Sequence, residues 1–263
     1  MWQQQVFFGV HYDYHANAND RNIGGDLSEE HLQEWLERIR PDWVQCDCKG
    51  HPGYASWPTK TGTPAPGIVR DPLRIHRDVC RRLGIRLGMH YSGVWDARAL
   101  ELHPDWAAVN EKGERSARMT CRHSPYVDEV MIPQLIELID VYDVDGFWVD
   151  GDNWASTPCW CEKCSAAFLS QTGATAVPRS PADRWWRRWL DFHRDLLRRF
   201  VKRYVDAVHA RKPDCQITSS FAYSARMPDS TVGIPVDYLS GDLDFRFSAQ
   251  NALLDGRVYD ARG

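Results

Sequence analysis

Carboxylate, histidine and aromatic side chains recur directly after short apolar runs of this sequence. Asp150 ends the run 146–150, and Asp242 follows the run 236–239 in Ser240-Gly241-Asp242. A sugar needs hydrogen-bond partners for its hydroxyls and a flat ring against its C–H face, and glycosidic cleavage needs two carboxyl groups. The further candidates for contacts to such a ligand are His11, Lys49, His51, Trp57, His90, Tyr91, Trp95, Asp152 and Trp154. Asp13, His15, Asp47 and Asp244 belong to the same set of polar residues at the ends of runs.

Six short runs that are β-branched or aromatic predict the strands that must position these groups. They are residues 6–11, 43–48, 85–91, 146–150, 216–222 and 236–239. Helices are predicted at 29–40, 73–83, 126–142 and 181–210, and Ser28, Asp71, Ser124 and Ser180 precede them as N-caps. Pro133 predicts a kink in the third helix. The aromatic stripe of the last helix, from Trp185 to Tyr204, is typical of core packing.

Alternation of strands and helices without tandem hairpins predicts an α/β fold with a parallel sheet. Tyr12-Asp13-Tyr14-His15 follows the first strand in place of a glycine-rich phosphate loop. Polar residues follow nearly every strand, which favours a (β/α)₈ TIM barrel with its site at the carboxyl ends of the strands. We expect residues 1–263 to form a single catalytic barrel domain. About six βα units are present, so we expect C-terminal truncation with the last two strands missing.

The composition argues against nucleic-acid binding and against a membrane-spanning protein. A net charge of -4, spread along 263 residues, gives no basic footprint for nucleic acid, and no run approaches the roughly 20 apolar residues of a membrane span. The N-terminus lacks the pattern of a signal peptide, so we expect a cytoplasmic protein. The 12 tryptophans suit an oligosaccharide or glycoside substrate, and a homo-oligomer is left open. Eight cysteines without a secretion signal favour a metal site over disulfides.

Two segments resemble the α-L-fucosidases of glycoside hydrolase family 29. Residues 49–58, Lys-Gly-His-Pro-Gly-Tyr-Ala-Ser-Trp-Pro, are similar to the loop after their second strand. Residues 145–151, Asp-Gly-Phe-Trp-Val-Asp-Gly, are very similar to their fourth strand. Residues 47–67 and 88–96 also resemble a group of glycosyl hydrolases related to the fucosidases. The likeness runs from residue 6 to about 155. Family 29 has paired histidines where this chain has Gly50-His51, so fucose specificity does not carry over.

The resemblance implies a retaining glycoside hydrolase in which Asp150 is the nucleophile. Gly151 is interpreted as leaving room for the sugar ring. Related α-glycosidase barrels pair carboxylates of the fourth and sixth strands, which favours Asp242 as the acid/base, against Asp152, Asp244 or a residue beyond this sequence. The alternative interpretation is a structural role, in which Asp242 caps the helix that follows it.

The C-x-C-x-x-C motif of Cys159, Cys161 and Cys164 allows three thiolates to meet at one tetrahedral ion. Residues 121–125 and 159–168 resemble the zinc cluster of family 42 β-galactosidases, which implies Cys121 as the fourth ligand. Four thiolates leave no open position, so the expected cofactor is a structural Zn²⁺. The opposing interpretation is four reduced thiols in a loop. The catalytic Asn-Glu pair of family 42 is absent, so its catalytic residues do not transfer.

Two other functions stay open. A metal-dependent hydrolase on the same barrel could use His11 and His90, although the fifth and sixth predicted strands contain no histidine. A non-catalytic carbohydrate-binding barrel could hold sugar through His51, Trp57 and Trp95. A barrel fold alone decides neither. Lys49, at a strand end, requires a carboxylate or a ligand as partner.

Overall fold

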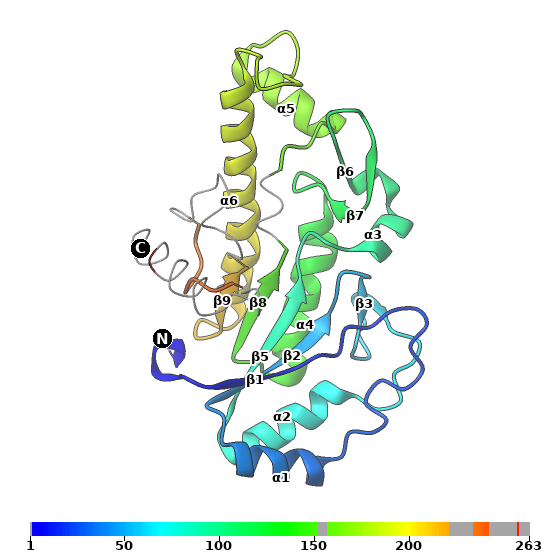
Figure 1. Cartoon of the computed structure of the whole chain (residues 1–263), viewed down its shortest axis with the longest axis vertical. Coiled ribbons are helices and arrows are strands. Elements are labelled where there is room, and N and C mark those ends of the chain that lie inside the picture. Colours follow the sequence, from blue (N-terminus) through cyan, green and yellow to red (C-terminus); the bar gives the residue numbers. More distant parts are fainter. Residues whose placement is uncertain (1, 152–156, 221–233, 242–256, 258–263) are drawn as a thin grey trace.

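Five parallel strands form the centre of the molecule. The computed structural model describes residues 2–151, 157–220, 234–241 and 257. The strands are β1 (Gly9–Tyr12), β2 (Trp43–Lys49), β5 (Arg86–Ser92), β8 (Gly146–Asp150) and β9 (Gln216–Ser219). They lie side by side in chain order, each parallel to the next (Figure 1). This is the sheet of an α/β barrel, as predicted. Among the described residues it is not closed, because β1 and β9 pair with neighbours in the sheet on one side only.

Two predicted strands differ from the structure. The first begins at Gly9 and not at residue 6, because the amides of Phe7 and Phe8 donate to the Asp42 side chain instead of a neighbouring strand. Residues 236–239 form no regular strand: this segment runs beside β9 through a single bridge between Ser220 and Ser240. Within the part of the chain that the structure describes, the sixth unit is represented by this segment alongside the fifth strand.

Two loops after the strands, one after β2 and one after β5, carry small strands that the sequence pattern did not predict. β3 (Tyr54–Ala55) pairs antiparallel with the end of β2, and β4 (Thr63–Pro64) pairs with β3. β6 (Ala107–Val109) and β7 (Arg115–Thr120) form a hairpin. These additions extend the carboxyl edge of the sheet, where a barrel carries its site.

The first two long helices begin directly after the N-caps that the sequence predicted. Ser28 accepts a hydrogen bond from the amide of His31 at the start of α1 (Glu29–Ile39), and Asp71 accepts one from Arg74 before α2 (Pro72–Leu83). Asp96 caps the short α3 (Ala97–Leu102). Two short 3₁₀ turns also lie in this part of the chain: η1 (Trp2–Gln5) and η2 (Pro104–Trp106).

The later helices begin further along the chain than predicted. A π-helical turn, η3 (Val127–Met131), precedes α4 (Ile132–Tyr142), so the irregularity expected at Pro133 lies in the turn before it. After α5 (Glu162–Thr172), α6 (Trp186–Arg211) starts five residues later than predicted. The Asp183 carboxylate accepts from the amide of Trp185, which stabilises a turn in place of a first helical turn. No helix among the described residues is long and apolar enough to cross a bilayer.

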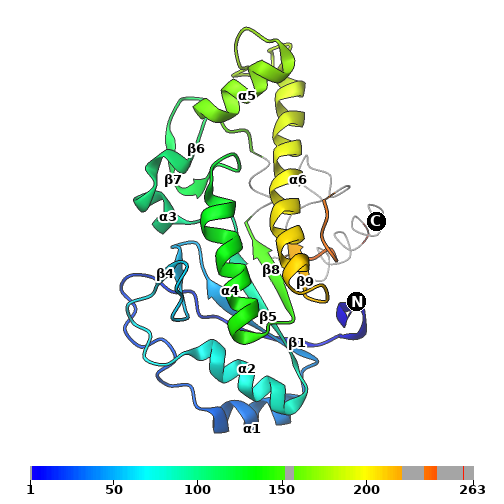
Figure 2. The same ribbon diagram turned by 180° about the vertical axis from the view of Figure 1, so that it is seen from behind.

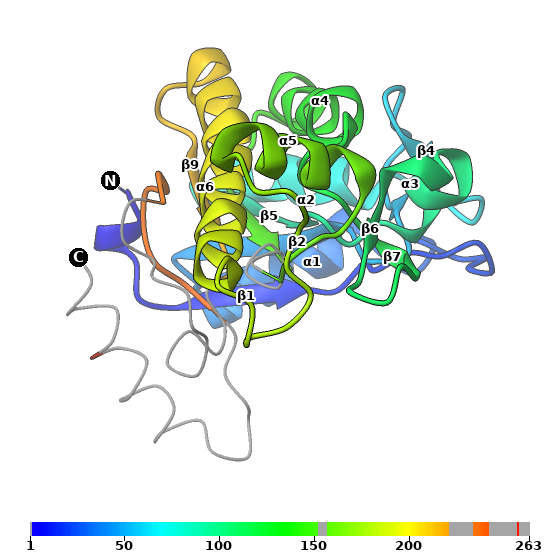
Figure 3. The same ribbon diagram turned by 90° about the horizontal axis from the view of Figure 1, so that it is seen from above.

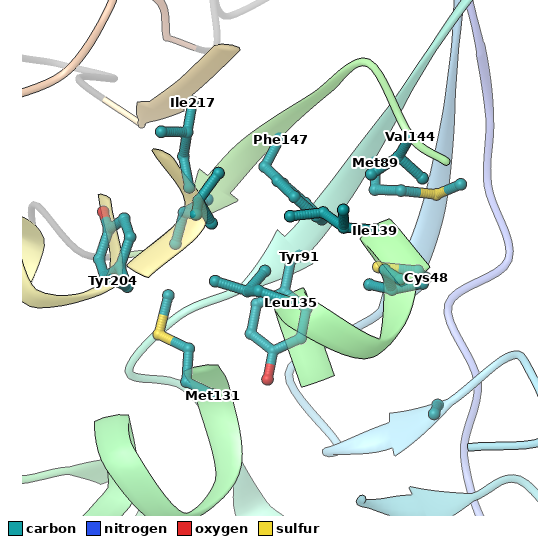
Figure 4. Packing of buried hydrophobic residues seen from close by; sticks show 14 of the residues in the cluster. Cys48, Met89, Tyr91, Met131, Leu135, Ile139, Val144, Phe147, Tyr204 and Ile217 are labelled. Atoms are coloured by element: carbon teal, nitrogen blue, oxygen red, sulfur yellow. The ribbon is translucent and has the colours of Figure 1, made fainter. Parts of the chain in front are cut away.

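The helices cover one face of the sheet and leave the other face to the site. Figure 2 shows α2, α4 and α6 in front of the strands, and in Figure 3 β1 lies on the opposite side from α4. The core between these layers contains alternate strand residues, including Met89, Tyr91, Phe147 and Ile217, packed against Met131, Leu135, Ile139 and Tyr204 (Figure 4). Because side chains alternate along a strand, the intervening residues face away from the helices.

A second, smaller core lies where α6 extends beyond the sheet and α5 packs against it (Figure 1). It contains Phe168, Trp189 and Phe192 beside Cys121, Cys159 and Cys164. The aromatic stripe of α6 is buried over its whole length except for the half-buried Trp185, so its prediction as core packing is confirmed.

Candidate active site

A cavity of about 540 Å³ opens at the carboxyl ends of the parallel strands. Its walls come from β1, β2, β5 and β8, from the residues that follow β1, and from residues 238–241. The predicted site residues that line it are His11, His90 and Asp150, together with Asp13, His15 and Asp47 of the wider set. Side chains from separate strands therefore meet at one cavity, as a barrel fold requires.

Asp47 is the buried centre of this site. Its side chain is 0% exposed, and one oxygen, Oδ2, lies 3.2 Å from Nε2 of His11 and 3.0 Å from Nδ1 of His15. Its other oxygen contacts Nδ1 of His90. Burial raises the pKa of a carboxyl group, but these hydrogen bonds from the three histidines outweigh burial and hold the pKa of Asp47 below its usual range. The carboxylate is ionised although it is enclosed.

His90 lies between two carboxylates. Nδ1 contacts Asp47, and Nε2 lies 3.8 Å from Oδ2 of Asp150. The ring stacks on Trp148, with 5.0 Å between centroids. Burial lowers the pKa of His90, but the hydrogen bonds and charges of Asp150 and Asp47 raise it to about 9. His90 is therefore an imidazolium at neutral pH.

Asp150 ends β8, and its side chain is 20% exposed at the cavity. Oδ2 also lies 3.5 Å from Nε2 of His51. Burial raises the pKa of Asp150, yet the hydrogen bond and charge of His90, with the charge of His51, lower it below the usual value. Asp150 is thus an ionised carboxylate that faces a sugar-sized cavity, which is the state a nucleophile needs.

His51 and Trp95 lie together beside Asp150. Nδ1 of His51 lies 2.5 Å from Oγ of Ser92, and the His51 ring stacks on Trp95 with 5.7 Å between centroids. Burial is the main cause that lowers the pKa of His51, so this ring is neutral at pH 7. The pair forms a flat wall next to the carboxylate.

Gly151 has a different role from the one its sequence suggests. Its φ is +80°, and a Cβ atom would lie 2.2 Å from Cδ1 of Trp95. The space beside Asp150 that we interpreted as room for a sugar ring is thus occupied by the Trp95 indole. Glycine is required here by the backbone conformation and by that ring.

Five predicted contact residues do not line the cavity: His51 and Trp95 beside Asp150, and Lys49, Tyr91 and Trp57. Lys49 is 0% exposed, and its ammonium group donates to Asp96 at 3.0 Å and to the Tyr126 hydroxyl at 3.2 Å. Tyr91 donates to Gln134, and Trp57 donates to Glu137 of α4. Lys49 thus has the carboxylate partner that the sequence required, on the helix side of the sheet.

A bulge in β2 explains the position of Lys49. Simple alternation from Asp47 would point Lys49 into the cavity. Asp47 pairs with His90 but Lys49 pairs with Tyr91, so Cys48 is an extra residue in β2. Lys49 therefore shares the face of Tyr91, against the helices.

Four residues of the predicted site lie outside the described residues. They are the proposed acid/base Asp242, its rivals Asp152 and Asp244, and the aromatic candidate Trp154. Seven cavity residues were missed: Trp43, Gln45, Trp148 and residues 238–241. The first three precede a chosen site residue by two or four positions along a strand, so period-two alternation could have found them.

The predicted cysteine cluster assembles in the structure. Cys121 comes from the loop after β7, Cys159 and Cys161 come from the segment that leads into α5, and Cys164 lies in the first turn of α5. All four Sγ atoms lie within 4.8 Å of one another, and the Cys121 sulfur lies 3.6 Å from that of Cys161 and 3.4 Å from that of Cys164. Zn–S bonds of about 2.3 Å imply tetrahedron edges of about 3.8 Å, so the four thiols fit one zinc ion.

Backbone amides donate hydrogen bonds to cysteine sulfurs of the cluster. The amides of Val109 and His123 donate to the sulfurs of Cys159 and Cys121, at 3.4 Å and 3.3 Å. Such N–H···S bonds favour thiolates. His193 accepts from the amide of Cys159, so the motif is also anchored to α6. The described cysteines are all free of disulfides.

One other group among the described residues has metal-ligand spacing. It consists of His15, Asp47 and His90, whose ligand atoms lie within 4.8 Å of one another. In the structure these side chains contact one another directly: Nδ1 of His15 lies 3.0 Å from one oxygen of Asp47, and Nδ1 of His90 contacts the other. This is the geometry of an imidazole–carboxylate network, whereas the metal-dependent hydrolase that the sequence left open would need an ion between these side chains.

The chain order of the parallel sheet and the cavity at its carboxyl edge define this chain as a (β/α)₈-barrel protein with part of the barrel present. Residues 28–151 match the family model described as hypothetical glycosyl hydrolase 6. This segment, which contains both His90 and Asp150, is thus related to the glycosyl hydrolases. A search of curated proteins finds no match to the sequence.

Solved structures with the same fold include several glycosidases. α-L-Fucosidase isoenzyme 2 from Paenibacillus thiaminolyticus is 21% identical with a TM-score of 0.68, over 82% of this chain and 32% of that one. A β-galactosidase from Bacillus circulans sp. alkalophilus is 16% identical with a TM-score of 0.58, over 95% of this chain and 43% of that one. An α-galactosidase from Lactobacillus brevis is 12% identical with a TM-score of 0.57, over 97% and 32%. At these identities the likeness shows the fold, and the chain spans less than half of each relative.

Proposed function

We propose that this chain carries the nucleophile half of a retaining glycoside hydrolase site, with Asp150 as the nucleophile. The observation that carries the proposal is an ionised carboxylate at the end of β8, open to a 540 Å³ cavity and flanked by His51 and His90. The family match over residues 28–151 supports the same reaction class.

In this reaction the Asp150 carboxylate attacks the anomeric carbon while the bond from that carbon to the leaving oxygen breaks. A carboxylic acid gives its proton to that oxygen. Water then cleaves the glycosyl ester and returns the proton to the same group, which regenerates both carboxyl groups. We propose Asp242 for the acid/base role, because the chain lines the cavity at residues 238–241, directly before it.

Fucosides and galactosides are the proposed substrate class. The related folds are named α-L-fucosidase, α-galactosidase and β-galactosidase. Among the described residues, stacking surfaces for such a sugar are offered by Trp148 in the cavity wall and by Trp95 beside Asp150.

We also propose that Cys121, Cys159, Cys161 and Cys164 hold a structural zinc ion. Bound there, zinc supplies a cross-link and no chemistry at the cavity, because four thiolates fill its coordination sphere. The link would join the loop after β7 to the segment before α5, and through His193 to α6.

Azide rescue tests the nucleophile. We expect Asp150→Ala to lose on the order of 10⁴-fold in turnover of 4-nitrophenyl α-L-fucoside or galactosides, since the covalent step is gone. Sodium azide fills the vacated space, so it should restore turnover and yield a glycosyl azide of inverted configuration. Asp13→Ala, which removes another carboxylate of the cavity, is the matched control and should show no azide product. Full activity of Asp150→Ala, or rescue of the control instead, would contradict the assignment.

A further inference from the structure

The histidine between Asp47 and Asp150 is placed to act on the nucleophile. Each ring nitrogen of His90 faces a different carboxylate: Nδ1 faces Asp47, and Nε2 faces Asp150. Trp148 stacks on one face of the ring, and the His90 side chain is only 7% exposed. The ring therefore has neither the space nor the hydrogen-bonding freedom to turn.

Asp47 belongs to the cavity wall, but its side chain is 0% exposed, and His11, His15 and His90 lie against its two oxygens. A buried, ionised carboxylate is costly unless it has such partners. Its position behind His90, on the side away from Asp150, indicates a charge that acts through the imidazole.

We propose that Asp47 and His90 form a positioning pair for Asp150: Asp47 holds His90 as an imidazolium whose Nε2–H points at Oδ2 of Asp150, which keeps that carboxylate ionised and oriented. The catalytic consequence rests on the proposed function, but the charge state of His90 does not. Asp47 and His90 are positioning residues, because both act through Asp150.

Other charged and titratable groups surround the pair. His11 and His15 of the β1 end face Asp47, and their rings lie edge-on to His90 at centroid distances of 5.9 and 5.1 Å. The hydrogen bond to Asp47 raises the pKa of His15, while Asp13 contacts the same nitrogen. On the Asp150 side, His51 is half-exposed and bonded to Ser92. Of the two histidines beside Asp150, only His90 has a carboxylate at both nitrogens.

Nuclear magnetic resonance of ¹⁵N-histidine-labelled protein tests the pair without a substrate. We expect one side chain with both ring nitrogens protonated at pH 7.5, absent from His90→Gln. Asp47→Asn and Asp150→Asn should each lower the titration midpoint of this signal by about one pH unit or more. His76→Gln, which removes a buried histidine of α2 that pairs with no carboxylate of the described residues, should leave the signal unchanged.

A neutral His90 at pH 7.5 in the wild-type protein would overturn the proposal, and so would a midpoint that neither Asp variant moves. It would also be overturned by a second metal equivalent, beyond cysteine-bound zinc, that disappears in His90→Gln. Because the wild-type spectrum is decisive, the test does not depend on every variant folding.

Replacing His90 should also change the kinetics of the proposed reaction in a characteristic way. His90→Gln should lower kcat about 10- to 100-fold with little change in KM, and should move the acidic limb of the kcat/KM profile to higher pH by about one unit. The direction follows because loss of the imidazolium raises the pKa of Asp150, which must be ionised to attack. An acidic limb unchanged in His90→Gln would contradict the pair, whereas failure of azide rescue at Asp150 would contradict the proposed function alone.

Discussion

Asp47 and Asp150 are two aspartates near the carboxyl ends of β2 and β8, the strands on either side of β5, and their surroundings give them different tasks. Asp47 is enclosed by three imidazoles and is 0% exposed, whereas Asp150 is partly exposed to the cavity. The sequence placed both after strands, but it could not rank them, because burial and partners depend on contacts across β1, β2 and β5. Asp150 was chosen through the likeness of its strand to known glycosidases.

Lys49 illustrates the limit of alternation at the scale of one residue. An extra residue in β2 moves its side chain to the helix face, where it pairs with Asp96 under Tyr91 and Tyr126. A bulge depends on local pairing with the next strand, so the sequence pattern of β2 alone does not show it.

Replacing this buried lysine should be costly. Lys49→Met leaves Asp96 charged and without its ion-pair partner, and we expect a loss of about 3–5 kcal/mol in the free energy of unfolding, measured by urea denaturation. Lys49→Met combined with Asp96→Asn should recover much of this loss, because asparagine removes the charge and can keep the cap of α3. Lys202→Met, which breaks an exposed pair with Asp206, should cost less than about 1 kcal/mol. Equal losses for the two lysine variants would contradict this account.

Gly151 allows a second comparison. Gly151→Ala forces a side chain into positive φ and against Trp95, whereas Gly84→Ala, at φ +68°, meets no atom within 4 Å. We expect about 1 kcal/mol of destabilisation at Gly84 and at least about 1 kcal/mol more at Gly151. Thermal unfolding gives the stabilities, and tryptophan fluorescence should change only in Gly151→Ala. Identical behaviour of the two variants would show that Trp95 does not occupy this space.

At the scale of elements, short sequence patterns predicted those features whose formation depends on residues close together in the chain. The caps at Ser28 and Asp71, the five parallel strands apart from the start of β1, and the buried stripe of α6 were predicted from patterns of a few residues. The starts of α4 and α6 were missed, because a π-turn and the Asp183 side chain compete with regular helix there. The β6–β7 hairpin lacks a strong strand pattern, since its exposed Arg115 and Arg118 face solvent.

The cysteine cluster is the element whose cofactor can be tested directly. We expect one zinc per chain by elemental analysis. Cys159→Ser should abolish binding and lower Tm by on the order of 10 °C, because α5 and the second core lose their cross-link. Cys80→Ser, at a buried thiol of α2 outside the cluster, should retain the metal. A metal-free wild-type protein that is as stable as the zinc-loaded one would contradict the structural role.

At the scale of the whole molecule, one face of the sheet is packed by helices and the other carries charge. The charged face concentrates Asp47, His90 and Asp150 at the carboxyl edge, while β1 and β9 bound the described sheet. The general architecture could be predicted, because alternation of strands and helices admits few folds. The path of residues 236–241 beside β9 could not be predicted. A segment joined to the sheet by one isolated bridge does not require the alternating apolar pattern of a strand.

This charge network should make global stability depend on pH. The folded pKa of His90 is raised from 6.5 to about 9, so the folded state binds a proton that the unfolded chain releases first. The stabilisation is complete below pH 6.5 and is lost as pH rises toward 9, by up to about 3 kcal/mol. Urea denaturation between pH 6 and 9.5 should show this fall, and His90→Gln should flatten it. A wild-type stability that rises with pH through this range would contradict the network.

The measurement that tests the central claim most directly is covalent trapping of the nucleophile. An activated 2-fluoro-fucoside or 2-fluoro-galactoside should inactivate the protein with a mass increase of one fluoroglycosyl group, and peptide mapping should place the label on Asp150, next to Gly151. Label on any other residue would contradict Asp150 as the nucleophile of this site.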